Sequence, residues 1–346
     1  MNSRQVDDYL LTDLIGYGSF GDVYLTQQQK NLNEKYATKV ISKSNQFIES
    51  LKREIYFLQQ LTHENIIKYK DEKETKNNIY LVLEYCNGGE LKNIHHRYIT
   101  ENNKPFPEEY VQHIMRQIFN GFYYLHTKNI MHRDIKLENI LLKFESDKDL
   151  DELNILKSTV KIIDFGFAKS LGENEVTVSI CGNPIASDPR IIEGMLKKTI
   201  KEGYDDRVDI WSLGIVAFQL LIGRSPFNGR SIPEINELIQ IGIYTIPKEI
   251  NLSLEAATMI SALLQHDEKN RFIWEQIFKL GFLNKDVKDF TPIDYNEIDN
   301  NSYLTFSTKN YDTIKDLWKR SIAKSNVLSK KDSNKSSLKV LQVINF

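Results

Sequence analysis

Three side chains that suit phosphoryl transfer lie close together in the stretch from His132 to Asn139. The carboxylate of Asp134 could take the proton from an attacking hydroxyl, which is the role of a general base. The ammonium of Lys136 could offset the charge on the phosphoryl group in transit, and the amide oxygen of Asn139 could bind Mg²⁺. The stretch therefore predicts the active site of a phosphotransferase.

A second acidic residue, Asp164, ends an apolar run of strand type and precedes a Phe-Gly pair. Mg²⁺ is a hard ion that prefers carboxylate, carbonyl and phosphate oxygens. Asp164 and Asn139 together therefore suit a Mg²⁺ ion that also binds the phosphates of a nucleotide. No group of histidines and cysteines has the spacing of a structural zinc site, so we expect no such metal.

A glycine pattern near the start of the chain, Gly16, Gly18 and Gly21, is shared by several kinds of phosphate-binding loop. A dinucleotide site would need a helix to begin at the third glycine. Here Val23 and Leu25 alternate with other residues and continue a strand, which favours a hairpin lid whose backbone N–H groups approach phosphates. A purely structural β-turn is the alternative.

Lys39 lies inside the β-prone run Tyr36–Ile41, where a buried ammonium needs an acidic partner. Glu54 follows in the segment from Phe47 to Leu61, whose apolar residues have the spacing of an amphipathic helix. Taken alone, such a glutamate is more often an ordinary surface residue. A pairing of Lys39 with Glu54 is the alternative.

These motifs, in this order, resemble those of the protein kinase family, and the resemblance covers residues 9 to 283. Within the family, the segments Leu83–Leu91 and Asp164–Lys169 are most similar to those of the ULK-type autophagy-initiating kinases. The polar insertion before Asp164 fits the same group.

The resemblance implies an α+β fold of two lobes. A five-stranded antiparallel sheet with one main helix would occupy residues 1–86, and a mostly helical lobe would occupy residues 87–283. Residues 284–346 match no element of the family, and their richness in Ser, Asn and Lys predicts a partly disordered extension.

The resemblance also implies how ATP is bound. Lys39 would contact the α- and β-phosphates, and Glu54 would position Lys39. The adenine would meet the backbone of the hinge between the lobes, from Glu84 to Cys86, with Leu83 at the back of the pocket. The other residues implied to bind ATP are glycines of the loop and apolar residues around the base: Ile15, Gly16, Gly18, Gly21, Val23, Ala37 and Leu141.

For catalysis, the resemblance assigns Asp134 as the base and Asn139 and Asp164 as the Mg²⁺ ligands. Lys136, two residues after the base, marks specificity for Ser and Thr over Tyr in this family. The function implied is an ATP- and Mg²⁺-dependent Ser/Thr protein kinase that acts on protein substrates. The likeness to ULK-type kinases adds autophagy initiation as the pathway.

The segment after Gly182 departs from the family pattern. Family members usually carry a threonine where Asn183 stands, and Ala-Pro-Glu where this chain has Asp-Pro-Arg ending at Arg190. The family's glutamate pairs with an arginine that would be Arg271. Two arginines facing each other predict repulsion unless another acid, Glu193 or Asp188, compensates.

A second class of function follows from these departures. Asn183 and Arg190 would suit a pseudokinase or a nucleotide-regulated binding module. The retention of Lys39, Asp134 and Asp164 together with Asn139 argues against this alternative, because a module without catalytic function does not need all four.

Two further predictions concern regulation and loop structure. Thr177 and Ser179 are candidate phosphate acceptors, with Ser179 favoured, because a phosphate there could pair with Arg133. Hydroxyl groups without a regulatory role are the alternative. Asp209, at the start of an apolar helix, could cap that helix or anchor the His132–Arg133 turn, and both roles are compatible.

Bulk composition narrows the possible partners and compartment. A net charge of −2 gives no reason to expect nucleic acid as a partner. The low cysteine content and the absence of an apolar signal core at the start predict a cytoplasmic protein. Basic residues from Lys319 onward could contact an anionic membrane or an acidic partner, or the tail could simply be solvated. The oligomeric state is left open.

Overall fold

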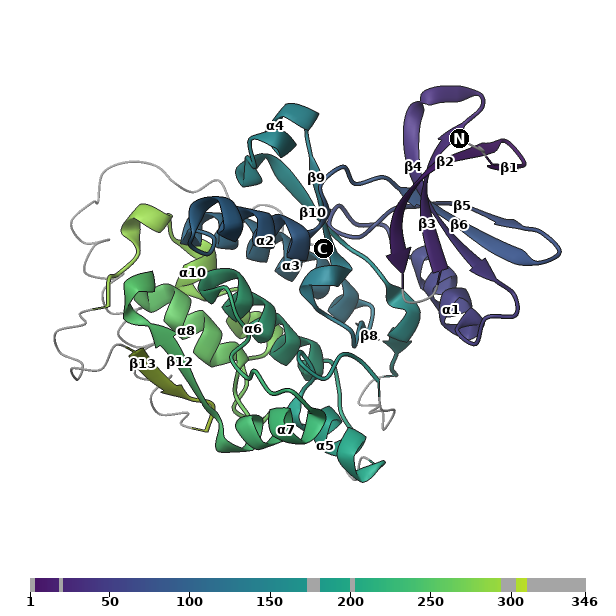
Figure 1. Cartoon of the computed structure of the whole chain (residues 1–346). Helices are drawn as coiled ribbons and strands as arrows, with labels where there is room; N and C mark the ends of the chain where they lie inside the picture. Colours follow the sequence, from purple (N-terminus) through teal and green to yellow (C-terminus); the bar gives the residue numbers. More distant parts are fainter. Residues whose placement is uncertain (1–3, 19–20, 173–180, 200–202, 294–302, 310–346) are drawn as a thin grey trace.

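The computed structural model describes residues 4–18, 21–172, 181–199, 203–293 and 303–309, and Figure 1 shows them as two lobes. The N-terminal lobe is an antiparallel sheet with helix α1 (Ile48–Leu58) packed beside it, and the second lobe is mostly helical. This arrangement confirms the predicted two-lobed α+β fold. The lobe boundaries at residues 86 and 283 stay predictions.

The sheet of the N-terminal lobe has six strands in the order β1-β2-β3-β4-β6-β5, where five were predicted. Its strands are β1 (Arg4–Val6), β2 (Tyr9–Gly18), β3 (Gly21–Gln28), β4 (Asn31–Ser42), β5 (Tyr69–Glu74) and β6 (Asn78–Glu84). The additional strand is β1, which folds back on β2 through Asp7 in a left-handed conformation. Buried Val6 packs against Leu11 and Tyr80, which explains why so short a strand is held.

Helix α1 presents an apolar face to the sheet, within the bounds that the sequence predicted. Leu51, Ile55 and Leu58 are buried on this face, and Glu54 is buried with them. Strand β4 runs through the middle of the sheet, between β3 and β6, and carries Lys39. The buried faces of α1 and β4 therefore bring the acidic Glu54 and the basic Lys39 to the same interface.

The second lobe is built around α6 (Arg207–Ile222), which is buried on nearly every side. A helix that is apolar all round is expected in the core of a lobe. The other helices are α2 (Leu91–Asn102), α3 (Glu108–Thr127), α4 (Asp147–Asp151), α5 (Pro189–Lys197), α7 (Ile232–Ile241), α8 (Leu254–Leu263), α9 (Trp274–Ile277) and α10 (Gly281–Asn284). Among the described residues, no helix has the length and apolar character needed to cross a membrane.

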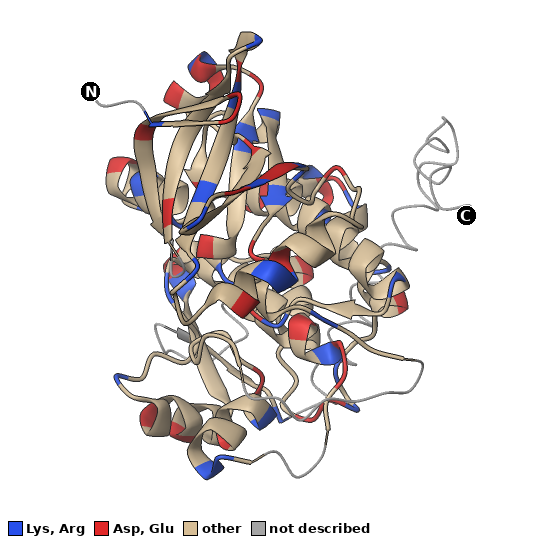
Figure 2. Ribbon diagram, turned by 90° about the vertical axis from the view of Figure 1, so that its right-hand side faces the viewer, with Lys and Arg blue, Asp and Glu red and all other residues tan. Residues whose placement is uncertain are grey.

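Short strands and 3₁₀ turns complete the lobe and position its loops. The strands are β7 (Gly89–Glu90), β8 (Ile130–Met131), β9 (Ile140–Phe144), β10 (Ser158–Ile162), β11 (Lys169–Ser170), β12 (Ile243–Pro247) and β13 (Tyr303–Ser307). The 3₁₀ turns are η1 (Leu137–Asn139), η2 (Ile155–Lys157), η3 (Phe165–Phe167), η4 (Lys248–Ile250) and η5 (Val287–Asp289). In Figure 2 basic and acidic residues are interspersed over both lobes, in keeping with the small net charge.

The polar insertion before Asp164 lies between β9 and β10, and only part of it faces solvent. It contains α4, whose first turn is capped by the Ser146 side chain accepting from the Asp149 N–H. Leu153 and Ile155 are buried against the lobe. These two buried apolar residues therefore fold the insertion back onto the core.

The C-terminal extension contributes a strand to the second lobe, which the sequence did not predict. β13 pairs antiparallel with β12, and Phe306 stacks on Tyr244 with ring centroids 5.5 Å apart. Leu304 is buried at 3% exposure. Residues 294–302 and 310–346, where disorder was predicted, lie outside the described part of the chain.

Replacing Leu304 with alanine is therefore expected to lower the free energy of unfolding by about 2 to 4 kcal/mol, because it removes buried methyl groups. Ile243→Ala on the paired strand is the matched control, since Ile243 is 48% exposed and should change stability by less than about 0.5 kcal/mol. Denaturant unfolding of both variants measures the difference. Equal stability of the two would contradict a structural role for β13.

Candidate active site

The catalytic loop brings the three residues of the central motif into direct contact. Lys136 Nζ lies 2.7 Å from Oδ2 of Asp134. Asn139, in η1, donates from Nδ2 to the same oxygen over 2.9 Å and to the backbone carbonyl of Asp134 over 2.7 Å. Asp134 is only 4% exposed. Its carboxylate is therefore oriented by two donors, as a positioned base requires.

The turn before Asp134 is held by Asp209 from the first turn of α6. The Asp209 carboxylate accepts the backbone N–H groups of His132 and Arg133, each over 2.8 Å. Arg133 has a φ of 69°, a conformation that costs energy for a residue with a side chain. Burial raises the pKa of Asp209, and the two N–H groups oppose that shift. The anchoring role proposed for Asp209 is therefore confirmed.

Asp209→Asn is expected to lower the stability of the protein by about 1 to 3 kcal/mol, because the amide leaves one of these N–H groups without an acceptor. A looser turn should also lower kcat by about tenfold or more, since the base loses its alignment. Asp286→Asn, at a surface ion pair with Lys288, is the control. Thermal unfolding measures the change in stability, and initial rates measure the change in kcat. An unaltered rate in Asp209→Asn would contradict a role of Asp209 in aligning Asp134.

Lys39 and Glu54 form the ion pair that the sequence suggested. Lys39 Nζ lies 2.6 Å from Glu54 Oε2, and the two residues are 8% and 2% exposed. Burial lowers the pKa of Lys39, but the attraction of Glu54 and Asp164 outweighs it and leaves the pKa above its ordinary value. The pair is thus close to Asp164, and the surface reading of Glu54 is wrong.

The turn that carries Asp164 is tied to α1 by contacts that sequence reasoning missed. Asp164 adopts a left-handed φ of 66° and accepts the Gly166 N–H. The Gly166 carbonyl accepts from Ser50 Oγ over 2.9 Å and from Arg53 Nη1 over 2.7 Å. A Cβ at Gly166 would come within 2.4 Å of Ser50 Oγ, so this contact requires glycine. Helix α1 therefore positions Asp164 as well as Lys39.

The glycine pattern lies in the hairpin between β2 and β3, with Gly18 opposite Gly21 and Gly16 opposite Val23. No helix begins at Gly21, because β3 starts there. This arrangement rules out the dinucleotide-binding reading and agrees with a hairpin lid. Ser19 and Phe20, at the tip of the loop, lie outside the described residues.

The apolar residues predicted to surround the adenine of ATP come from strands of both lobes: Ile15, Val23, Ala37 and Leu141. Each is at least partly exposed. Val23 lies opposite Lys39 in the sheet. A residue predicted to contact adenine is therefore next to one predicted to contact the phosphates. Accessible apolar side chains beside a few polar groups suit a ligand site. Their contact with ATP stays a prediction.

The hinge residues have side chains that serve the fold. Glu84 pairs with Lys143 over 2.7 Å and with Lys161 over 2.9 Å, and so connects β6 to β9 and β10. Burial raises the pKa of Glu84, but these two ammonium groups outweigh it and keep the pKa low. Cys86 is buried in the core, and burial raises its thiol pKa to about 12. Glu84 and Cys86 would therefore contact adenine through their backbone, as the resemblance implies.

The predicted regulatory residues Thr177 and Ser179 lie outside the described residues, so their roles stay predictions. Arg133, the predicted partner of a phosphate, donates from Nε to the carbonyl of Phe167 over 2.7 Å. Asn183 accepts the Ile185 N–H through its side chain over 3.0 Å, in a local turn.

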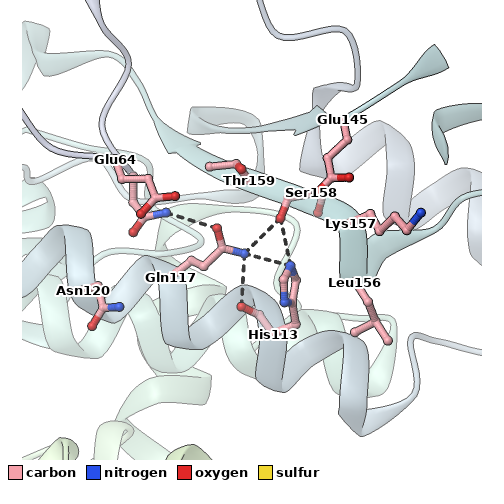
Figure 3. Close-up of a pocket in the computed structure, with 10 residues that line it drawn as sticks. Glu64, His113, Gln117, Asn120, Glu145, Leu156, Lys157, Ser158 and Thr159 are labelled. Carbon is pink, nitrogen blue, oxygen red and sulfur yellow. Dashed lines mark hydrogen bonds between the residues drawn. The ribbon is translucent and has the colours of Figure 1, made fainter. Parts of the chain in front are cut away.

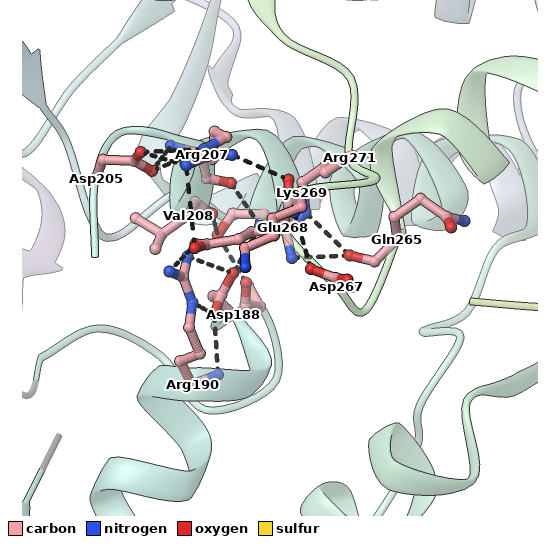
Figure 4. A network of polar contacts seen from close by, with 12 residues as sticks. Asp188, Arg190, Asp205, Arg207, Val208, Gln265, Asp267, Glu268, Lys269 and Arg271 are labelled. Atoms are coloured by element: carbon pink, nitrogen blue, oxygen red, sulfur yellow. Dashed lines mark hydrogen bonds and ion pairs between the residues drawn. The ribbon is translucent and has the colours of Figure 1, made fainter. Parts of the chain in front are cut away.

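The predicted repulsion between Arg190 and Arg271 does not arise. Asp188, one of the two acids considered, accepts from Arg271 over 2.6 Å and from Arg190 over 3.0 Å (Figure 4). Glu193, the other acid, forms an ion pair with Lys197 one turn along α5. The acid at the helix start faces the lobe, whereas the acid inside the helix faces solvent, and this difference decides which one compensates.

A hollow of about 310 Å³ lies between α3 and β10, and none of the predicted site residues lines it (Figure 3). His113 and Gln117 point from α3 to the carbonyl of Ser158, over 2.8 and 3.2 Å. The Gln117 oxygen accepts the Val160 N–H over 3.0 Å. These side chains form hydrogen bonds with backbone groups on the open edge of β10, which is a structural role.

A sheet lobe with a buried Lys–Glu pair, packed over a helical lobe that carries an Asp-Lys-Asn loop, defines a phosphotransferase of the two-lobed class. The protein kinase domain family matches residues 9–283, and the chain belongs to that family.

Three relatives show the extent of the similarity. Human serine/threonine-protein kinase ULK1 is 34% identical over 277 residues, which is 79% of this chain and 25% of the relative. Serine/threonine-protein kinase atg1 of Dictyostelium discoideum is 32% identical over 295 residues, covering 83% and 41%. Calcium-dependent protein kinase 5 of Plasmodium falciparum is 36% identical over 290 residues, covering 82% and 47%. The matched part thus spans a quarter to about half of each relative.

Proposed function

We propose that this protein is an ATP-dependent Ser/Thr protein kinase, which transfers the γ-phosphoryl group of ATP to hydroxyl groups of protein substrates. The observation that carries the proposal is the direct contact of Asp134 with both Lys136 and Asn139. The buried pair of Lys39 with Glu54 supports it. The names of the ULK1 and atg1 relatives support the Ser/Thr class.

In this mechanism, Asp134 accepts the proton of the substrate hydroxyl, and Lys136 offsets charge on the phosphoryl group. Mg²⁺, when bound, neutralises the β- and γ-phosphates. Asn139 and Asp164 would hold the ion through an amide and a carboxylate oxygen, which suit it. In the described parts of the chain, no group of three or more acidic, His or Cys residues could hold a metal ion.

The reaction is tested with γ-labelled ATP, Mg²⁺ and a generic basic protein, followed by identification of the labelled amino acid. The proposal predicts label on serine or threonine and none without Mg²⁺. Label confined to tyrosine would overturn the Ser/Thr assignment, and absence of transfer by folded protein would favour the pseudokinase alternative. The intact contacts of Asp134 argue against that alternative.

Autophagy initiation is the narrower role that we propose, on the basis of the motif likeness to ULK-type kinases. Loss of the protein should then block the formation of autophagosomes in starved source cells. Wild-type protein should restore it, and Asp134→Asn should not. Normal autophagosome formation without the protein would remove this role and leave the proposed reaction unaffected.

A further inference from the structure

A lysine, Lys92, occupies the first turn of α2, which contains no acidic residue. The positive end of a helix dipole lies at the N-terminus, so an ammonium group there is disfavoured. Lys92 Nζ lies 2.8 Å from Oε1 of Glu138, an acid in η1 that belongs to the catalytic loop. Glu138 therefore compensates a cation in a place that α2 itself does not favour.

The Lys92–Glu138 ion pair contributes little to the stability of the fold. The side chains of Lys92 and Glu138 are 56% and 33% exposed. Ion pairs between exposed groups stabilise proteins only weakly, because water screens the attraction and two long side chains lose freedom. The main effect of Lys92 is therefore on the charge beside the catalytic loop.

A second acid, Glu90, lies near Glu138 and immediately precedes α2. Its carboxylate accepts from Asn93 Nδ2 over 3.5 Å, and among the described residues no lysine or arginine lies within ion-pair distance of it. Burial raises the pKa of Glu90 and Glu138 adds to this shift, whereas Lys92 and Lys136 oppose it. Two carboxylates therefore share this part of the surface with one exposed ammonium group.

Lys136, the other cation near Glu138, is held by the predicted base. Its Nζ lies 2.7 Å from Oδ2 of Asp134, so Lys92 is the lysine that contacts Glu138 directly. Lys136 and Glu138 are two positions apart, and their Cα atoms are therefore within about 7 Å. An extended chain covers about 3.3 Å per residue. A protein substrate whose hydroxyl meets Asp134 can therefore place a side chain a few positions away beside Glu138.

We infer that Lys92 determines substrate specificity: its ammonium group neutralises Glu138, so that a basic side chain near the acceptor hydroxyl gains nothing there. This inference rests on the proposed kinase function. Without Lys92, the carboxylates of Glu138 and Glu90 would face an arginine of the substrate, whose guanidinium pairs with carboxylates through parallel N–H donors. With Lys92 in place, that arginine has to displace an ammonium group that already holds Glu138.

The test uses full-length protein and peptides that differ by one arginine. The parent peptide has one serine and no charged residue within five positions of it, and the other peptides carry an arginine at each of those positions in turn. We expect every arginine peptide to have a kcat/KM within about twofold of the parent with wild-type protein. With Lys92→Ala, arginine at one or two neighbouring positions should raise kcat/KM by about fivefold or more, mainly through KM.

Further variants assign the effect to the charge of Glu138. Lys92→Ala combined with Glu138→Gln should lose the preference for arginine, because an amide forms no ion pair. Lys92→Arg keeps the positive charge and should give the wild-type peptide profile. Lys288→Ala breaks a surface ion pair with Asp286 outside α2 and η1, and this matched control should also give the wild-type profile. The preference in Lys92→Ala should weaken in high salt, which screens exposed charges.

Three results would overturn the inference: a wild-type protein that already prefers arginine about fivefold, a wild-type profile in Lys92→Ala, or a preference that persists after Glu138→Gln. If wild-type protein phosphorylates no peptide, including the parent, the proposed function fails. Calorimetric titration with the arginine peptides then decides on Lys92. Binding about fivefold tighter by Lys92→Ala than by wild-type protein supports the inference, and equal affinities reject it.

Discussion

Asp134→Asn is expected to lower kcat for phosphoryl transfer by about 10²- to 10⁴-fold, the usual contribution of a general base. The amide keeps the size of the carboxylate, so the contacts with Lys136 and Asn139 change little in shape. It cannot accept the proton of the substrate hydroxyl. Rates with labelled ATP and a basic protein measure the loss.

ATP affinity separates loss of chemistry from loss of binding in this variant. We expect Mg²⁺-dependent ATP affinity within about twofold of the wild type, because the proposed mechanism places Asp134 at the substrate hydroxyl and not at the nucleotide. Asp151→Asn, on the exposed face of α4, is the control and should leave the rate unaltered. A rate in Asp134→Asn equal to that of the control would exclude Asp134 as the base.

Asp164→Asn should have the second large effect, a loss of about 100-fold or more in kcat/KM together with weaker Mg²⁺-dependent ATP binding. An uncharged amide binds a hard dication less well than a carboxylate does. The ammonium group of Lys39 lies near Asp164 but is held mainly by Glu54. The Lys39–Glu54 ion pair should therefore survive the substitution. Calorimetric titration of ATP at several Mg²⁺ concentrations measures the binding.

The effect of Asp164→Asn on ATP binding should depend on Mg²⁺. If Asp164→Asn bound ATP with the wild-type Mg²⁺ dependence, Asp164 would not be a ligand of the ion. Asp147→Asn, near the hinge and exposed, is the control for the loss of one negative charge and should titrate as the wild type does.

Residues that act within one short motif could be predicted from the sequence. Asp134, Lys136 and Asn139 are fixed by a single turn, so their spacing already determines their contact. The pair of Lys39 and Glu54 could be predicted because a buried lysine in a strand requires an acid, and α1 offers one. The family resemblance selected that acid.

Contacts between distant segments could not be predicted in the same way. Ser50 donates to Gly166, which lies 116 positions further along the chain, and no sequence pattern at either residue predicts this contact. Asp188 and Glu193 were equal candidates by charge, and only the direction of α5 against the lobe separates them. β13 follows a stretch of ordinary polar composition, and its burial depends on Tyr244 in another part of the chain.

The most direct test of the account is calorimetric titration of ATP into folded wild-type protein with and without Mg²⁺. A site made by Lys39, Asn139 and Asp164 predicts ATP binding that strengthens with Mg²⁺ and weakens when EDTA removes the ion. Well-folded protein with no Mg²⁺-dependent affinity for ATP would contradict the account.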